Sequence, residues 1–201
     1  MAYSNFTLDT VRSEFELEIV EYAGVFSETD VVMPRDRFMS ELEERVQLAI
    51  SIGTEKARSE LIVTDVLFEL REQFDRGISF FSGIDFNVDD DKGLTGVCDF
   101  LVSLSPILSF LDAPIIILVE AKKDNLTLAF GQCAAEMLAA QRFNAEKGND
   151  FSCIYGATTS GTDWRFLKLE GQKLHIDRTL YSIGQCDKIL GILVSMVKQQ
   201  V

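Results

Sequence analysis

The segment 114–121, PIIILVEA, constrains the fold of this chain most strongly. A continuous apolar run of this length is typical of a strand that lies inside a sheet and is buried on both faces. An alanine-rich stretch at 125–146, which ends at Lys147-Gly148, predicts a long helix. A further strand is predicted at 151–158. Strand, helix and strand in this order predict a βαβ crossover and therefore parallel pairing of the two strands.

The remaining elements follow from periodicity and capping residues. Apolar and acidic side chains alternate over 14–26, which predicts a half-exposed strand. Ser40 with Glu43 has the pattern of a capping box and predicts a helix start. Thr54 is expected to cap a second helix that runs to about Arg71. The pattern further predicts strands at 78–88 and 96–103, a hairpin of 164–169 with 174–176, and a helix at 187–199.

Length and composition indicate one α/β domain. The chain has 201 residues, of which 47% are hydrophobic and 25% charged, close to the average of globular proteins. We find no internal repeat and no segment with the composition of a linker. We therefore expect a single domain over 1–201, with residues 1–53 as an N-terminal strand and helix extension and 161–201 as a C-terminal hairpin and helix.

The charge is negative and unevenly distributed. The net charge is −13, and residues 1–95 carry 21 acidic and 9 basic side chains, against 11 and 10 in residues 96–201. An acidic chain repels phosphate backbones at long range. The composition therefore argues against a protein that coats nucleic acid, but it leaves room for one local groove on the near-neutral half.

Cysteine usage and the absence of targeting patterns favour the cytoplasm. No two of the four cysteines, Cys98, Cys133, Cys153 and Cys186, form a C-x-x-C pair, so we expect reduced thiols. His175 is the only histidine, which makes a zinc site or a Ser-His-Asp triad improbable. We find no secretory signal and no apolar run of about 18 residues, so we expect a cytoplasmic protein without a membrane span.

Three charged residues stand at unusual places in the predicted sheet. Glu120 and Lys122 share one face at the end of the apolar strand, because residues two apart in a strand point the same way. Burying them is costly unless they pair or bind something. Asp99 lies on the preceding predicted strand and could sit beside Glu120. A divalent cation relieves the repulsion between two close carboxylates, and Lys122 could position or deprotonate a water molecule.

These residues resemble the core motif of the PD-(D/E)XK nuclease superfamily. Asp99 precedes the tripeptide Glu120-Ala121-Lys122 by twenty-one residues, as counted to Glu120, and the segment 96–100 resembles the strand that carries the first acid of the motif. The resemblance implies that Asp99 and Glu120 bind Mg²⁺ or Mn²⁺ together with the Ala121 carbonyl. It also implies that Lys122 orients the attacking water and stabilises charge on the scissile phosphate.

Two helical residues extend the resemblance. Glu60 lies where the superfamily places an acid on the helix before the core strands, and Gln132 lies where several members carry a glutamine. The resemblance implies that Glu60 supports a second ion or orders water, and that Gln132 holds Lys122 or the phosphate. It covers roughly residues 54–160 and implies a restriction-endonuclease-like mixed sheet flanked by helices. Cys98 replaces the proline that often precedes the first acid.

The activity implied is metal-dependent phosphodiester hydrolysis of nucleic acid, with DNA favoured over RNA. The alternative is a non-catalytic protein-binding or regulatory module on the same fold, which binds a protein partner or a second copy through the acidic strand at 14–22. For the individual residues, Glu120 and Lys122 could instead form a solvent-exposed ion pair, and Asp99 could be a buried acid that accepts backbone hydrogen bonds.

Basic residues near the predicted site give a weaker signal. They could form a rim that faces phosphate, but a scattered, solvated surface is the favoured interpretation. The residues are Lys123, Arg142, Lys147, Arg165 and Lys168.

Overall fold

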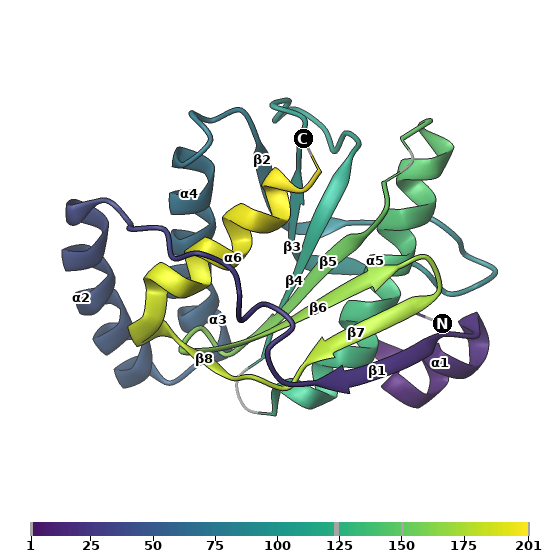
Figure 1. Ribbon diagram of the computed structural model, residues 1–201, viewed down its shortest axis with the longest axis horizontal. Coiled ribbons are helices and arrows are strands. Elements are labelled where there is room, and N and C mark those ends of the chain that lie inside the picture. The colour runs from purple at the N-terminus through teal and green to yellow at the C-terminus, as the bar shows by residue number, and fades with distance from the viewer. Residues whose placement is uncertain (1, 123–124, 150, 201) are drawn as a thin grey trace.

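The computed structural model describes residues 2–122, 125–149 and 151–200, which form a mixed sheet between two layers of helices (Figure 1). The strands are β1 (Glu18–Tyr22), β2 (Ser79–Asp85), β3 (Val97–Ser103), β4 (Ile115–Ala121), β5 (Ile154–Thr159), β6 (Asp163–Glu170), β7 (Lys173–Asp177) and β8 (Tyr181–Ser182). Seven strands lie in the order β1-β7-β6-β5-β4-β3-β2, and β8 pairs with β6. The pairs β4–β5 and β1–β7 are parallel, and the other neighbours are antiparallel.

Helices cover both faces of this sheet. In Figure 1, α6 crosses the near face beside α2, α3 and α4, whereas α5 lies behind the sheet. The helices are α1 (Leu8–Phe15), α2 (Asp36–Ile52), α3 (Glu55–Arg58), α4 (Thr64–Glu72), α5 (Phe130–Glu146) and α6 (Cys186–Lys198). A π-helical turn at Ser59–Val63 joins α3 to α4, and a 3-10 turn at Leu126–Ala129 leads into α5. Shorter 3-10 turns lie at Tyr3–Asn5 and Ile183–Gln185.

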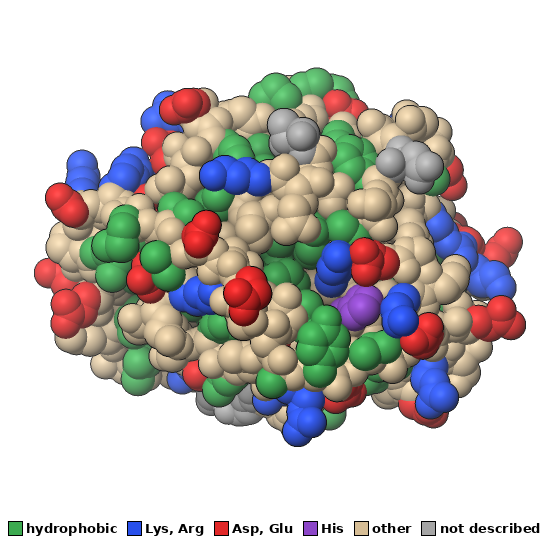
Figure 2. Space-filling model, viewed as in Figure 1, with side chains coloured by type: hydrophobic (Ala, Val, Ile, Leu, Met, Phe, Trp, Pro, Cys, Tyr) green, Lys and Arg blue, Asp and Glu red, His purple; other side chains and the backbone are tan. Residues whose placement is uncertain are grey.

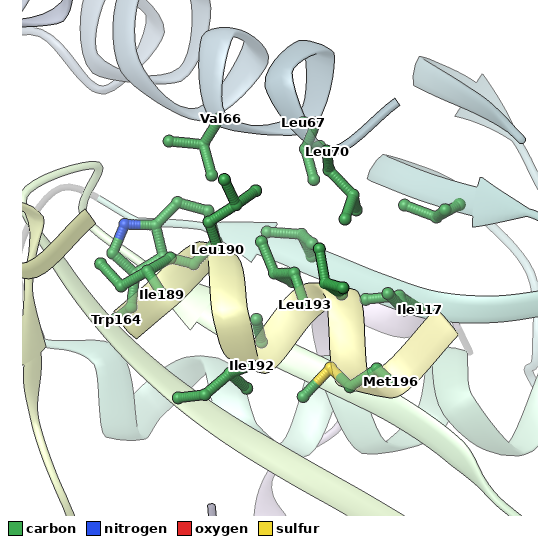
Figure 3. Packing of buried hydrophobic residues seen from close by; sticks show 14 of the residues in the cluster. Val66, Leu67, Leu70, Ile117, Trp164, Ile189, Leu190, Ile192, Leu193 and Met196 are labelled. Carbon is green, nitrogen blue, oxygen red and sulfur yellow. The ribbon is translucent and has the colours of Figure 1, made fainter. Parts of the chain in front are cut away.

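The core on the near face lies around α6. Apolar residues at helical spacing give α6 a continuous buried stripe that includes Leu190 and Leu193. Figure 3 shows these side chains pointing toward Val66 and Leu70 of α4, with Ile117 of β4 nearby. Each of these residues is almost completely buried, and burying one such side chain contributes about 1.5–3 kcal/mol.

The core on the other face depends on the close approach of α5. An added Cβ at Gly131 would lie 2.3 Å from the backbone carbon of Thr7. An added Cβ at Gly156 on β5 would lie 2.5 Å from the sulfur of Met137. Small residues therefore let α5 lie directly on the N-terminal segment and on the sheet, which explains its alanine content. This packing also places the side chains of α5 against the end of β4.

Most of the elements expected from the sequence are confirmed. β4, α5 and β5 form the parallel crossover unit. The two strands before this unit, the hairpin of β6 and β7, and the terminal helix α6 lie within a few residues of their predicted positions. Thr54 caps α3, because its hydroxyl accepts a hydrogen bond from the Ala57 amide at 3.1 Å.

Two expectations for the N-terminal region are wrong. The predicted strand at 14–26 begins as helix α1, which Thr7 opens with a capping box, and only Glu18–Tyr22 is extended. Glu16 ends this helix in the left-handed conformation, so the alternating pattern spans two elements. Ser40 does not start α2, which begins four residues earlier at Asp36; the Ser40 hydroxyl donates to the Arg37 carbonyl inside the helix.

The first 53 residues are built into the rest of the molecule. β1 pairs with β7 at the edge of the same sheet. Phe26 and Phe38 lie in the core around α6, and Val11 and Phe15 lie in the core around α5. The region therefore contributes to both hydrophobic cores.

Candidate functional site

Asp99 and Glu120 meet where β3 and β4 lie side by side. The antiparallel register pairs Phe100 with Val119, so the next residues along, Asp99 and Glu120, lie opposite each other. Asp99 Oδ2 accepts a hydrogen bond from the Ala121 amide at 2.8 Å. The structure thus brings together the two acids that the sequence analysis selected. Asp99 also accepts a backbone hydrogen bond, as expected from the alternative interpretation that it is a buried structural acid.

Glu120 and Lys122 form an ion pair that is buried at one end only. Lys122 Nζ lies 2.5 Å from Glu120 Oε1. The Glu120 side chain is 1% exposed, whereas that of Lys122 is 35% exposed. The pair is therefore different from the solvent-exposed ion pair of the alternative interpretation, because its carboxylate lies inside the protein and its ammonium lies at the boundary with solvent.

A third acid, Glu136 of α5, joins this site and was missed in the sequence. It is fully buried and accepts a hydrogen bond from Gln132 Nε2 at 3.1 Å, one helical turn away. Gln132 therefore binds Glu136, and no hydrogen bond of the described residues joins it to Lys122. The signal was present, since Glu136 is an acid among alanines and other apolar residues on the predicted long helix.

The carboxyl groups of Glu120 and Glu136 interact directly and shift each other's pKa. Burial and the nearby charge of Asp99 together raise the pKa of Glu120 to about 7, although the Lys122 ammonium opposes both. Burial also holds the pKa of Glu136 well above its usual range, and the charge of Glu120 adds to this. One ammonium cannot balance three buried carboxylates, so their mutual repulsion favours the protonated forms of the two buried glutamates.

Asp99 and Lys122 are shifted by the same environment. Burial raises the pKa of Asp99, against the hydrogen bond from the Ala121 amide and the charge of Lys122. Burial alone would lower the pKa of Lys122, but the hydrogen bond and charge of Glu120 reverse this effect and raise it overall. Lys122 therefore stays an ammonium at neutral pH, which suits it to orient and stabilise negative charge rather than to accept a proton.

Glu60 lies outside this cluster. It forms a 3.1 Å ion pair with Lys56 on the surface, and its side chain is 60% exposed. No hydrogen bond or ion pair of the described residues joins Glu60 to Asp99 or Glu120. The helical acid whose charge acts on both Asp99 and Lys122 is instead Glu55, at the start of α3.

The donor atoms of this site suit a hard divalent cation. Glu120 Oε2 and Glu136 Oε2 are buried and receive no hydrogen bond from another donor residue, so either a proton shared between the two carboxyl groups or a bound cation would satisfy them. Carboxylate and carbonyl oxygens are the ligands that Mg²⁺ and Mn²⁺ prefer. As the described side chains stand, no three of type His, Cys, Asp or Glu are grouped to hold a metal ion.

Most of the other basic residues are engaged elsewhere. Arg142 pairs with Asp89, and Lys168 lies 2.9 Å from Glu170. Lys123 lies outside the described residues. On the face shown in Figure 2, acidic and basic side chains are interspersed. These observations agree with a solvated surface for this set, apart from Arg165, which lines a pocket near the site.

Comparison of the chain with protein-family models, curated proteins and solved structures gave no match. The fold and the site define an α/β protein with a mixed eight-stranded sheet and a buried acidic centre at the end of β4. All four cysteines are buried and unpaired. Across the described residues, no helix combines the length and the apolar character needed to cross a membrane.

Proposed function

We propose that this protein is a Mg²⁺- or Mn²⁺-dependent nuclease of PD-(D/E)XK type, with a restriction-endonuclease-like fold. The observation that carries the proposal is the juxtaposition of Asp99 and Glu120 on neighbouring strands, with Lys122 bonded to Glu120 at 2.5 Å. These residues belong to the near-neutral half of the chain, where a phosphate backbone meets the least repulsion.

Each residue of the centre has a distinct role in this proposal. Asp99, Glu120 and the Ala121 carbonyl would hold the ion, which supplies Lewis-acid activation of the phosphate and of the attacking water. The Lys122 ammonium stabilises charge that develops on the phosphate. Glu136, held by Gln132, is a positioning residue, because its carboxyl group interacts with that of Glu120 and is shielded from solvent.

The proposed substrate is DNA, and a single strand is the first form to test. A single domain of 201 residues offers a small surface for gripping a duplex. Cleavage of a duplex would therefore require a homodimer or a protein partner.

Calorimetric titration of Mn²⁺ at pH 8 tests the ion site without any assumption about the substrate. We expect Asp99→Ala and Glu120→Ala to abolish the binding seen in wild type. Glu60→Ala is the matched control. It removes an acid of the same charge that is exposed and that has no hydrogen bond or ion pair to Asp99 or Glu120 among the described residues. Unchanged Mn²⁺ affinity in both centre variants would reject the proposal.

A second candidate function is protein binding through β1, which lies at the edge of the sheet and pairs with β7 alone. Glu18 and Glu21 are exposed on it, so a strand added there would favour basic side chains. This candidate predicts a complex that is unaffected by Asp99→Ala and weakened by a proline in place of Val20. The partner could be a second copy of the chain, and analytical ultracentrifugation of the wild-type protein alone tests this form of the hypothesis.

A further inference from the structure

A polar pocket of about 270 Å³ opens beside the acidic centre, at the end of β5. Its walls come from α3, from the segment that follows β4, and from the turn between β5 and β6. The lining residues are Arg58, Asn125, Leu126, Thr127, Ser160, Asp163, Arg165 and Leu180. A backbone hydrogen bond links the two regions, because the Lys122 amide donates at 2.8 Å to the carbonyl of Thr159, the residue before Ser160 of the pocket wall.

Arg165 lies on the same face of the sheet as Glu120. The register pairs Glu120 with Thr158 on β5, and Thr158 with Arg165 on β6. Residues paired in this way point to the same face, and two strand spacings separate Arg165 from Glu120 by about 10 Å. Between them, the Thr158 hydroxyl is buried without a hydrogen-bond partner.

The N–H donors of the Arg165 guanidinium have no acceptor among the described residues. It lies 6.0 Å from the centre of the Phe130 ring, so its stem is held against α5. Among the described residues it forms no ion pair and no side-chain hydrogen bond. A guanidinium carries five N–H donors, and Arg165 is one of the residues that line the pocket.

Arg58 approaches the same pocket from α3. Its Nη1 donates at 3.4 Å to both the Ser160 carbonyl and the Thr162 hydroxyl, and its Nε is buried without an acceptor. Among the described lining residues the one carboxylate is that of Asp163, which accepts from the Thr162 hydroxyl at 3.0 Å and from the Ser160 hydroxyl at 3.4 Å. Asp163 thus holds the turn together, and among these described residues the two arginines outnumber it.

We infer that this pocket binds a phosphate group of a nucleic acid strand, held between Arg58 and Arg165. Two guanidiniums with free donors match the oxygens of a phosphate, which arginine binds in a fork geometry. Arg165 and Glu120 share one face of the sheet, so the strand would continue from the pocket into the acidic centre. This last step rests on the proposed nuclease function, but phosphate binding by the arginines does not.

Binding without metal tests the pocket separately from the centre. The probes are a ten-nucleotide thymidylate strand with a 3′ dye and either a 5′ phosphate or a 5′ hydroxyl, measured by fluorescence anisotropy in EDTA. We expect Arg165→Gln and Arg58→Gln to weaken binding by about tenfold each. We also expect each variant to reduce the slope of log affinity against log salt by about 0.7. Arg37→Gln, which removes an exposed arginine on α2, should change neither.

Further variants separate loss of the contact from loss of the fold. Arg165→Lys keeps the charge and the stem, so it should keep the salt slope while losing part of the affinity. A larger effect with the 5′-phosphate probe would identify a terminal phosphate, and equal effects would identify an internal one; both support the pocket. Unchanged affinity in Arg165→Gln and Arg58→Gln, or no binding of either probe to wild type, would overturn it.

The same measurements distinguish failure of the phosphate pocket from failure of the proposed nuclease function. Arginine-dependent binding in a protein that shows no binding of Mn²⁺ would keep the pocket and reject the metal centre. Mn²⁺ binding that needs Glu120, with strand binding that ignores both arginines, would do the reverse.

Discussion

Glu120 and Glu136 place two carboxyl groups together inside the protein, and this arrangement has a cost that depends on pH. Asp99 adds a third acid, while Lys122 is the cation bonded to the group. The sequence revealed Asp99, Glu120 and Lys122 because charged residues are conspicuous at the ends of apolar strands. The role of Glu136 was missed, because the inward direction of its side chain becomes clear only from the packing of α5 on the sheet.

The first prediction concerns stability as a function of pH. Burial gives Glu120 a pKa of about 7 in the folded protein, above the value of about 4.5 expected for an unfolded chain. The folded state therefore binds more protons than the unfolded state between these values. The free energy of unfolding should fall as the pH rises from about 4.5 to 7, by about 3 kcal/mol from this group. Urea denaturation in EDTA from pH 4.5 to 8 measures the change.

A variant and a ligand check the cause. Glu120→Gln removes the titrating group and should flatten this part of the pH profile, whereas Glu60→Gln should leave it as in wild type. Saturating Mn²⁺ should restore stability mainly at the alkaline end, because an ion binds the deprotonated carboxylate. A wild-type profile that rises between pH 4.5 and 7 would show that the carboxyl groups are stabilised in their charged forms.

At the scale of the elements, local sequence signals succeeded where one interaction dominates. The apolar run of β4 allows only a buried strand, and Thr54 has the hydrogen bond expected of a helix cap. The signals failed where neighbouring elements share one pattern, as at 14–26. The prediction for Glu60 failed for a similar reason, because it assumed one regular helix and the structure has a π-helical turn between α3 and α4. In the structure, Glu55 is the helical acid whose charge acts on Asp99.

The second prediction concerns the packing of α5. Gly131→Ala should lower the free energy of unfolding by about 1–3 kcal/mol, because the new methyl group would meet the Thr7 and Phe6 backbone at 2.3 and 2.5 Å. Gly184→Ala is the control, since its nearest neighbour would be the Ser182 hydroxyl at 3.9 Å. Chemical denaturation compares the two, and equal stability of both variants would mean that α5 is free to shift.

At the scale of the whole molecule, one sheet divides the interior into two cores, and the N-terminal residues enter both. The resemblance to a nuclease core covers 54–160 and treats 1–53 as an extension. The structure instead places β1 in the main sheet and α2 against the π-helical turn that joins α3 to α4. The sequence could not show this, because long-range pairing such as β1 with β7 leaves no mark in the local pattern of either segment.

The last prediction is that residues 54–201 do not fold alone. Two effects of the deletion oppose each other. Residues 1–53 carry eleven acidic and four basic side chains, so their removal reduces the repulsion within a chain of net charge −13. It also removes eight buried apolar side chains larger than alanine, at about 1.5–3 kcal/mol each. That loss is comparable with the entire stability of a typical domain, about 5–15 kcal/mol, so hydrophobic burial decides the outcome. The shortened chain should show no cooperative thermal transition by circular dichroism, whereas the full chain should show one. A cooperative transition in the shortened chain near the full-length melting temperature would make residues 1–53 a true appendage.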